Sequence, residues 1–219
     1  MPSTVVHLAV AALLATALLG REFRPRTVAV VLLAVALVDA DAFVGLYLPG
    51  AHRSLFHTLL LPLVLGVALL VDTRLRERSA LRERWGSGAV RVAWVVAAAV
   101  LFAGIFPDLF TNGVNAFYPL HDRFYTVDGR LALSNQRGLV QSFVQGPPET
   151  VHTTENLHYR TGVDPSPGAE SATVERVFPV VNGGWQLMLV IVGAVTLGVR
   201  LWETRGTRGT RAETADGRR

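Results

Sequence analysis

The sequence predicts an all-α membrane protein with about five transmembrane helices and a small extracytoplasmic subdomain, α+β or irregular, between the fourth and fifth helices. Half of the 219 residues are hydrophobic and only 17% are charged, a composition typical of membrane proteins. In addition, five apolar stretches approach the roughly 20 residues that a helix needs to cross a bilayer. They are residues 4–20, 27–48, 54–72, 89–106 and 179–202.

These stretches divide the chain into four parts. Residues 1–110 are expected to form a four-helix transmembrane core, and residues 179–203 the fifth transmembrane helix. Residues 111–178 are polar and too long for a simple loop, which predicts the extracytoplasmic subdomain. Residues 204–219 repeat Arg-Gly-Thr with few apolar side chains, so we expect a disordered cytoplasmic tail.

Within the polar segment, short motifs predict turns and strands. Asn112-Gly113 indicates a turn, and Asp128-Gly129 is a typical β-hairpin signal. The stretch 135–145 fits a short strand or helix, and residues 149–178 predict short strands at most.

The arginines predict the orientation in the membrane, because basic residues gather in short cytoplasmic loops. Fifteen of the 21 basic residues, all of them arginine, fall in the first loop, the third loop and the tail, whereas the second loop carries only Arg53. This distribution favours a multi-pass protein of the cell (inner or plasma) membrane with its N-terminus outside and its C-terminus in the cytoplasm. The arginine-rich tail fits anionic lipid headgroups and indicates no specific nucleic acid; the sequence does not indicate an oligomeric state.

Ionisable residues recur at the same end of successive apolar stretches. They are His7, Asp39 and Asp41, His52 and His57, and Asp108. With this topology all six lie near the outer leaflet, where such residues are costly and are usually paired or functional. The chain has no cysteine, so any metal must be held by His, Asp or Glu. His nitrogen and carboxylate oxygen suit a divalent ion such as Zn²⁺ or Mn²⁺.

We expect His7, Asp39, Asp41 and His57 to be metal ligands, and His52 or Asp108 to be a ligand or the general base. Asp39 and Asp41 are about 200° apart on a helix, so one could be a ligand and the other an acceptor that orients an imidazole. Two roles fit Arg53 equally: a clamp on a substrate phosphate or carboxylate, or an ion pair with one of these aspartates.

The ordered motifs resemble the YdjM-like family of membrane-bound metal-dependent hydrolases, a family of LexA-binding, inner-membrane-associated proteins. The matches are an early His7, Asp39-Ala40-Asp41, His52-Arg53 through His57-Thr58, and Asp108 through Thr111 leading to Tyr118-Pro119. The resemblance covers about residues 1–120. It implies a hydrolase site that holds a metal ion.

Two departures from the family pattern stand out. Members usually have Pro before the Asp-x-Asp motif, where this chain has Val38, and a His four residues before the later Asp, where it has Gly104. The missing His would be one ligand, so the resemblance implies a site with fewer protein ligands, a substitute ligand or lost turnover.

The predicted function is a metal-dependent hydrolase in the membrane, acting on a lipid or lipid-linked phosphoester at the outer interface, with His52, Arg53 and Asp108 as catalytic residues. The alternative is a non-catalytic membrane protein in which the same His/Asp/Arg network is structural and the extracytoplasmic subdomain binds a partner. A transporter fits less well, because coupled transport sites usually lie at the midplane.

Overall fold

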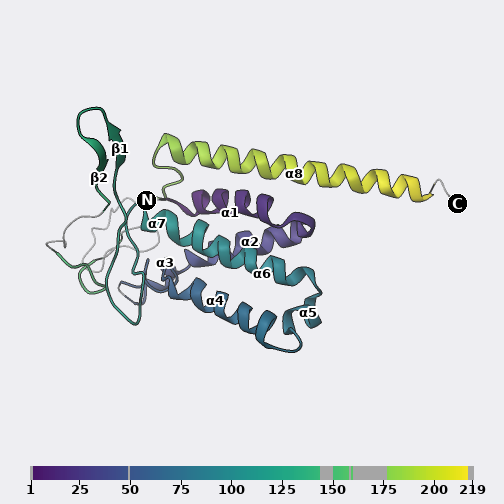
Figure 1. The fold of residues 1–219 in the computed structure, drawn as a ribbon, viewed down its shortest axis with the longest axis horizontal. Helices are drawn as coiled ribbons and strands as arrows, with labels where there is room; N and C mark the ends of the chain where they lie inside the picture. Colours follow the sequence, from purple (N-terminus) through teal and green to yellow (C-terminus); the bar gives the residue numbers. More distant parts are fainter. Residues whose placement is uncertain (1, 49, 144–149, 158, 160–176, 217–219) are drawn as a thin grey trace.

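The computed structural model describes residues 2–48, 50–143, 150–157, 159 and 177–216. Four helices lie side by side in Figure 1: α1 (Thr4–Leu18), α2 (Pro25–Val38), α6 (Gly88–Ala99) and α8 (Gly184–Asp216). Small and β-branched residues four positions apart, such as Ala11 and Ala15 in α1 and Val31 and Val35 in α2, are fully buried between them. Such residues allow helix backbones to approach closely in a membrane.

Within the part of the chain that the structure describes, three helical segments are long and apolar enough to cross a membrane: Pro25–Val44, Gly88–Leu109 and Gly184–Arg205. The predicted count of five is therefore not confirmed. The first apolar stretch forms a helix of only 15 residues. The third begins at Leu60 rather than Ser54, because residues 52–58 form turns that bring their polar side chains into the protein, which leaves α4 (Leu60–Leu70) with 11 residues.

The helix that starts with α6 changes its winding near its end. A π-helical stretch, Val100–Ile105, follows α6 and leads into the short α7 (Phe106–Leu109). Pro107 has no backbone N–H, so it cannot bond the carbonyl of Ala103 four residues earlier. The carbonyl of Ala103 therefore lacks the donor that a regular α-helix would supply, and π-helical turns of this kind often occur at functional sites.

At the opposite end of the bundle, α4 continues as a π-helix, Val71–Leu75, and the chain turns into α5 (Ala80–Trp85). Ser79 caps α5 by accepting a bond from the N–H of Arg82, and its hydroxyl donates to Asp72 at 2.6 Å. This hydrogen bond lowers the pKa of the partly buried Asp72 carboxyl. A short helix, α3 (Asp41–Val44), follows α2 at the other end.

The polar segment between α7 and α8 contains one antiparallel pair, β1 (Leu131–Ser134) and β2 (Gly138–Gln141), with Leu131 opposite Gln141. The hairpin turn lies at residues 135–137, so its prediction at Asp128-Gly129 was wrong. The Ser134 hydroxyl accepts bonds from the N–H groups of Gln136 and Arg137, which fixes the turn there. Of the predicted short strands in 149–178, the part at 149, 158 and 160–176 lies outside the described residues.

The last helix, α8, packs along α1 and extends past the other helices (Figure 1). The contact is close at Gly193, where an added Cβ would lie 2.7 Å from the carbonyl oxygen of Ala9. The helix also continues to Asp216, through most of the tail that was expected to be disordered. No proline interrupts it, and the pair Arg200–Glu203 at 3.1 Å supports the turn at which the tail begins.

Candidate metal centre

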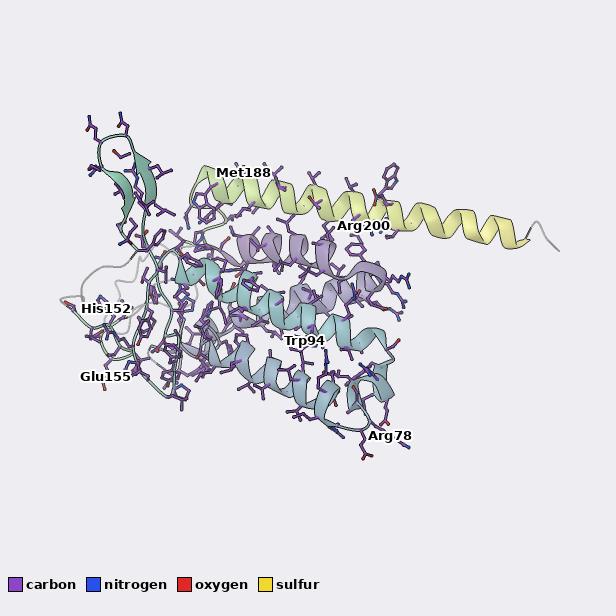
Figure 2. All side chains as sticks on the ribbon, in the orientation of Figure 1. Arg78, Trp94, His152, Glu155, Met188 and Arg200 are labelled. Atoms are coloured by element: carbon purple, nitrogen blue, oxygen red, sulfur yellow. The ribbon has the colours of Figure 1, made fainter. Side chains whose placement is uncertain are left out.

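Four chain segments bring ionisable side chains together at the end of the bundle that carries β1 and β2. His7 lies on α1, Asp39 caps α2, Asp108 lies on α7, and His57 lies in the turns before α4. His7, His57 and Asp108 are buried, and the Asp39 side chain is 18% exposed. In Figure 2, the labelled His152 and Glu155 mark this end of the molecule, and Arg78 marks the opposite end.

The Nε2 nitrogens of His7 and His57 lie close to the same two carboxylate oxygens. His7 Nε2 lies 3.4 Å from Asp108 Oδ2 and 3.9 Å from Asp39 Oδ1. His57 Nε2 lies 3.1 Å and 3.4 Å from the same two oxygens, but without the geometry of a hydrogen bond. Tetrahedral metal–ligand bonds of about 2.1 Å place ligand atoms about 3.4 Å apart. Within the described residues, His7, Asp39 and Asp108 each offer one ligand atom within 4.8 Å of the other two, a group that could hold a metal ion, and His57 lies beside this group.

His7 is oriented by the carbonyl that Pro107 leaves free. Its Nδ1 lies 2.6 Å from the oxygen of Ala103. Since a carbonyl can only accept, Nδ1 carries the proton, and in the neutral ring the lone pair of Nε2 points toward Asp39 and Asp108. A metal-ligating histidine in proteins is typically held in this way, by an acceptor on its other nitrogen.

His57 is oriented by Asp41. Its Nδ1 donates to Asp41 Oδ2 at 2.7 Å. Its Nε2 therefore faces the same two oxygens as His7 Nε2, those of Asp39 and Asp108. Asp41 also accepts bonds from the backbone N–H of Arg53 at 3.1 Å and of Phe56 at 3.4 Å. Its other oxygen, Oδ1, lies 3.1 Å from His52 Nδ1. Both oxygens of this fully buried carboxylate are therefore engaged within the protein.

His52 shares Asp41 with His57 but faces a different direction. Its Nε2 is buried and has no hydrogen-bond partner among the described residues, while its Nδ1 donates to Asp41. The two rings are 6.3 Å apart and nearly perpendicular. One carboxylate thus fixes the tautomer of two histidines. In each ring the Nε2 is then the nitrogen with a free lone pair.

Arg53 pairs with Asp108, a partner outside the two aspartates that the sequence had suggested for it. Its Nη2 donates to Asp108 Oδ1, and its Nη1 lies 3.5 Å from the carbonyl oxygen of Gly113. The side chain is 1% exposed, and the backbone has a φ of 62°, which is uncommon outside glycine. Asp108 thus directs Oδ1 to Arg53 and Oδ2 to the cluster.

Tyr159 covers Arg53, and sequence reasoning missed it. The guanidinium carbon lies 4.6 Å from the ring centre of Tyr159, a cation–π geometry. The Tyr159 hydroxyl donates to the carbonyl of Asn112 at 2.7 Å, and burial raises the pKa of this phenol. An aromatic residue in a polar loop was the signal available in the sequence, but nothing near it indicated its partner.

Asp122 holds the segment 150–157 close to the site by hydrogen bonds. This carboxylate accepts bonds from the backbone N–H and the hydroxyl of Thr154, and from the side-chain amide of Asn115. Gly50, with a φ of 78°, lies so close that an added Cβ would be 2.4 Å from the carbonyl oxygen of Thr154. Asp122 therefore anchors a surface segment near the site and is not part of the ligand cluster. His121 and His152 are exposed, and His158 lies outside the described residues.

A cavity of about 300 Å³ opens beside the cluster. Its polar wall includes His7, Asp39, Asp108, His52 and Arg53, and its remaining wall is largely apolar. That wall includes Pro2, Ala36, Ala40, Ala42, Phe43, Phe178 and Pro179. The cavity thus joins the candidate ligands to a largely apolar wall.

Val38 and Gly104, the two residues that depart from the expected family pattern, lie next to each other. Gly104 is buried, and a Cβ added to it would lie 3.1 Å from a methyl carbon of Val38. The side chain that replaces the usual proline therefore occupies space beside the position at which the usual histidine is absent. Within the described residues, the side chains that remain as candidate ligands are His7, His57, Asp39 and Asp108.

The chain matches the model of a protein family described as YdjM inner membrane protein, over residues 1–159. No curated protein and no solved structure matches it. The matched region extends beyond the 120 residues that carry the motifs, and it includes Asp122 and Tyr159. Because this region is most of the 219 residues, and because the chain has three apolar helices long enough to cross a membrane, the protein is a membrane protein that belongs to the YdjM family.

Proposed function

We propose that this protein is a metal-dependent hydrolase of the membrane, with its site at the outer membrane–water interface and a lipid or lipid-linked phosphoester as its substrate. The observation that carries the proposal is the common orientation of the two histidines. His7 and His57 each donate Nδ1–H to a protein acceptor and direct Nε2 at the same two carboxylate oxygens.

The residues that would hold the ion are His7, Asp39, His57 and Asp108. Two imidazole nitrogens and two carboxylate oxygens form a mixed donor set that fits Zn²⁺ or Mn²⁺. This set differs from the sequence-based expectation in two residues. Asp41 becomes the group that orients His57, because its oxygens already accept four bonds, and Asp108 becomes a ligand through Oδ2. A bound divalent ion would supply a Lewis acid and lower the pKa of water.

His52 is the residue of the chain best placed to move a proton. His52 lines the cavity, its Nε2 has no hydrogen-bond partner among the described residues, and Asp41 holds the ring in the tautomer in which Nε2 is a base. A general base contributes typically 10²–10⁴-fold to a rate. Arg53 acts through Asp108, whose second carboxylate oxygen it holds, and its buried position argues against the role of a mobile substrate clamp.

The substrate class follows from the wall of the cavity. Phe43 and Phe178 line it and are themselves 59% and 63% exposed, so an apolar chain can lie against them while a phosphoryl group reaches the cluster. The arginine-rich loops lie at the other end of the bundle, and under the positive-inside rule this distribution supports an outer-leaflet position for the cavity.

The alternative function is structural. A buried network of histidines, aspartates and an arginine can hold helices together without any ion, and the Arg53–Asp108 pair fits that role. In that case substitution of His57 lowers thermal stability and nothing else. The extracytoplasmic segment would then be the functional part, as a surface for a partner.

Metal analysis of the purified protein tests the two functions against each other. Elemental analysis by mass spectrometry is expected to find one equivalent of Zn or Mn per chain, and His57→Ala and Asp108→Asn are expected to lose it. His121→Ala and His152→Ala, which remove exposed histidines, are matched controls and keep it. A chain that takes up no transition metal, even after incubation with Zn²⁺ and Mn²⁺, contradicts the proposal. Phosphate release from phospholipid and lipid-linked phosphoesters then tests turnover, with His52→Gln expected to keep the metal and lose at least 100-fold in rate.

A further inference from the structure

A second and larger cavity lies at the opposite, arginine-rich end of the bundle. It has a volume of about 740 Å³, within the range of small-molecule binding sites. Helices α2, α4 and α6 form its sides, and α5 with the following turn closes its end. Figure 1 shows how the space arises, since α4 diverges from α6 toward α5.

The lining of this second cavity changes along its length. Val30, Leu69 and Val96 belong to its apolar part, and Glu22 and Arg24 belong to its polar end. The lining of α6 runs from Gly88 to Val96, about 12 Å at the rise of a helix. Trp85 of α5 also lines it and is 66% exposed, as is typical of tryptophan at a membrane interface. The cavity therefore has the polarity profile of one bilayer leaflet.

The polar end carries one charge of each sign. Glu22 Oε2 and Arg24 Nη2 are 3.9 Å apart, and their side chains are 27% and 60% exposed. A pair so loose and so exposed contributes little to stability, so both groups can bind a ligand at little cost. A phosphate next to Arg24 would be repelled by Glu22 unless the ligand also carried a positive charge nearby.

We infer that this second cavity is a binding site for a phospholipid with a phosphoethanolamine headgroup. Arg24 binds the phosphate, Glu22 binds the ammonium group, and one acyl chain lies between α2, α4 and α6. This site is separate from the candidate metal centre and does not depend on the proposed function. The lipid would fill the space that α2, α4 and α6 line, at the end of α4 that leads toward α5.

Native mass spectrometry of the full chain in detergent tests the inference with defined lipids. Phosphatidylethanolamine is expected to stay bound at one per chain at an activation energy that removes phosphatidylglycerol. Arg24→Gln, which removes the phosphate partner, and Ala68→Phe, which fills the cavity from α4, are expected to reduce its occupancy at least tenfold. Arg26→Gln and Val67→Phe are the matched controls, because each lies close by in the sequence, is exposed and does not line the cavity.

Three results would overturn the inference. Equal retention of phosphatidylglycerol and phosphatidylethanolamine would exclude the headgroup assignment. Equal lipid occupancy in Ala68→Phe and Val67→Phe would exclude the cavity as the site. A dimer that Ala68→Phe dissociates would show that a second copy of the chain, and not a lipid, covers the cavity. None of these results depends on metal content, so they leave the proposed function to its own test.

Discussion

The Nδ1 of His7 lies 2.6 Å from the carbonyl oxygen of Ala103, a group that a regular helix would have used for its own hydrogen bond. Pro107 leaves that carbonyl free, and the π-helical stretch Val100–Ile105 places it opposite α1. A proline in one helix thus fixes the orientation of a histidine in another helix, 96 residues away in the sequence. In the sequence, Pro107 appears only as the residue before Asp108.

Replacing Pro107 by alanine is expected to weaken metal binding. Alanine restores a backbone N–H that competes with His7 for the carbonyl of Ala103, and loss of such an outer partner typically costs 10–100-fold in metal affinity. Competition with a chromophoric chelator measures this affinity. Pro62→Ala in α4 is the control. The carbonyl four residues before it, that of Thr58, accepts a bond from the backbone N–H of Leu61 and orients none of the candidate ligands. Equal loss in both variants would contradict a specific role for Pro107.

Asp41→Asn is expected to lower both the metal affinity, by about 10–100-fold, and the thermal stability of the metal-free protein. An amide oxygen can accept part of the bonds that the carboxylate accepts, but the amide nitrogen would face His52 or His57 with another donor. Asp72→Asn, at the other end of the bundle, removes a carboxylate that also accepts several bonds and should leave metal affinity unchanged. If Asp41→Asn binds metal as tightly as the unsubstituted protein, Asp41 does not orient the ligand.

Gly104 and Val38 are expected to be energetically coupled. Gly104→Ala places a methyl group 3.1 Å from a Val38 methyl, and overpacking of a core typically costs about 1–3 kcal/mol. Val38→Ala makes room, so the double variant should be more stable than the sum of the two single changes predicts. Thermal unfolding in detergent measures the cycle. Additive effects would mean that the two positions do not compete for the same space.

The clustering of these side chains could be predicted from the sequence, whereas their partners could not. His7, Asp39, His57 and Asp108 follow or begin successive apolar stretches at the same end, and the structure brings them together. Which carboxylate lies between the histidines and which orients a ring depends on where the turns at 52–58 place Asp41 relative to the rings. Tyr159 reaches the site through backbone contacts at Gly50 and Asp122 that leave no local pattern in the sequence.

The anchor of the segment 150–157 is expected to be sensitive to acid. Burial raises the pKa of Asp122, but the hydrogen bonds from Thr154 and Asn115 outweigh it, so the folded pKa is below the ordinary value. A lowered folded pKa means that the anchor is intact above the unfolded pKa of about 3.9. It is lost as the pH falls from there through the folded pKa.

Limited proteolysis with an acid-active protease measures this release. Cleavage within 150–157 is expected to increase as the pH falls below about 4, the unfolded value. In Asp122→Asn cleavage should already be fast at about pH 5, above the unfolded value, and change little with further acid. An unchanged cleavage rate in that variant would show that Asp122 does not hold the segment.

The loss of protein stability on replacing Arg53 is expected to depend on whether a metal ion is bound. Arg53→Met leaves Asp108 buried without its partner, and breaking a buried ion pair from one side typically costs about 3–5 kcal/mol. In the proposed site an ion bound at Oδ2 would offset part of that cost, so the loss should be largest without metal and smaller with saturating Zn²⁺. Thermal unfolding in detergent with and without Zn²⁺ measures the difference. Tyr159→Phe keeps the ring over Arg53 but loses the hydroxyl bond to Asn112, so any loss of stability there should be the same with and without Zn²⁺. The same loss of stability with and without Zn²⁺ in Arg53→Met would favour the purely structural network.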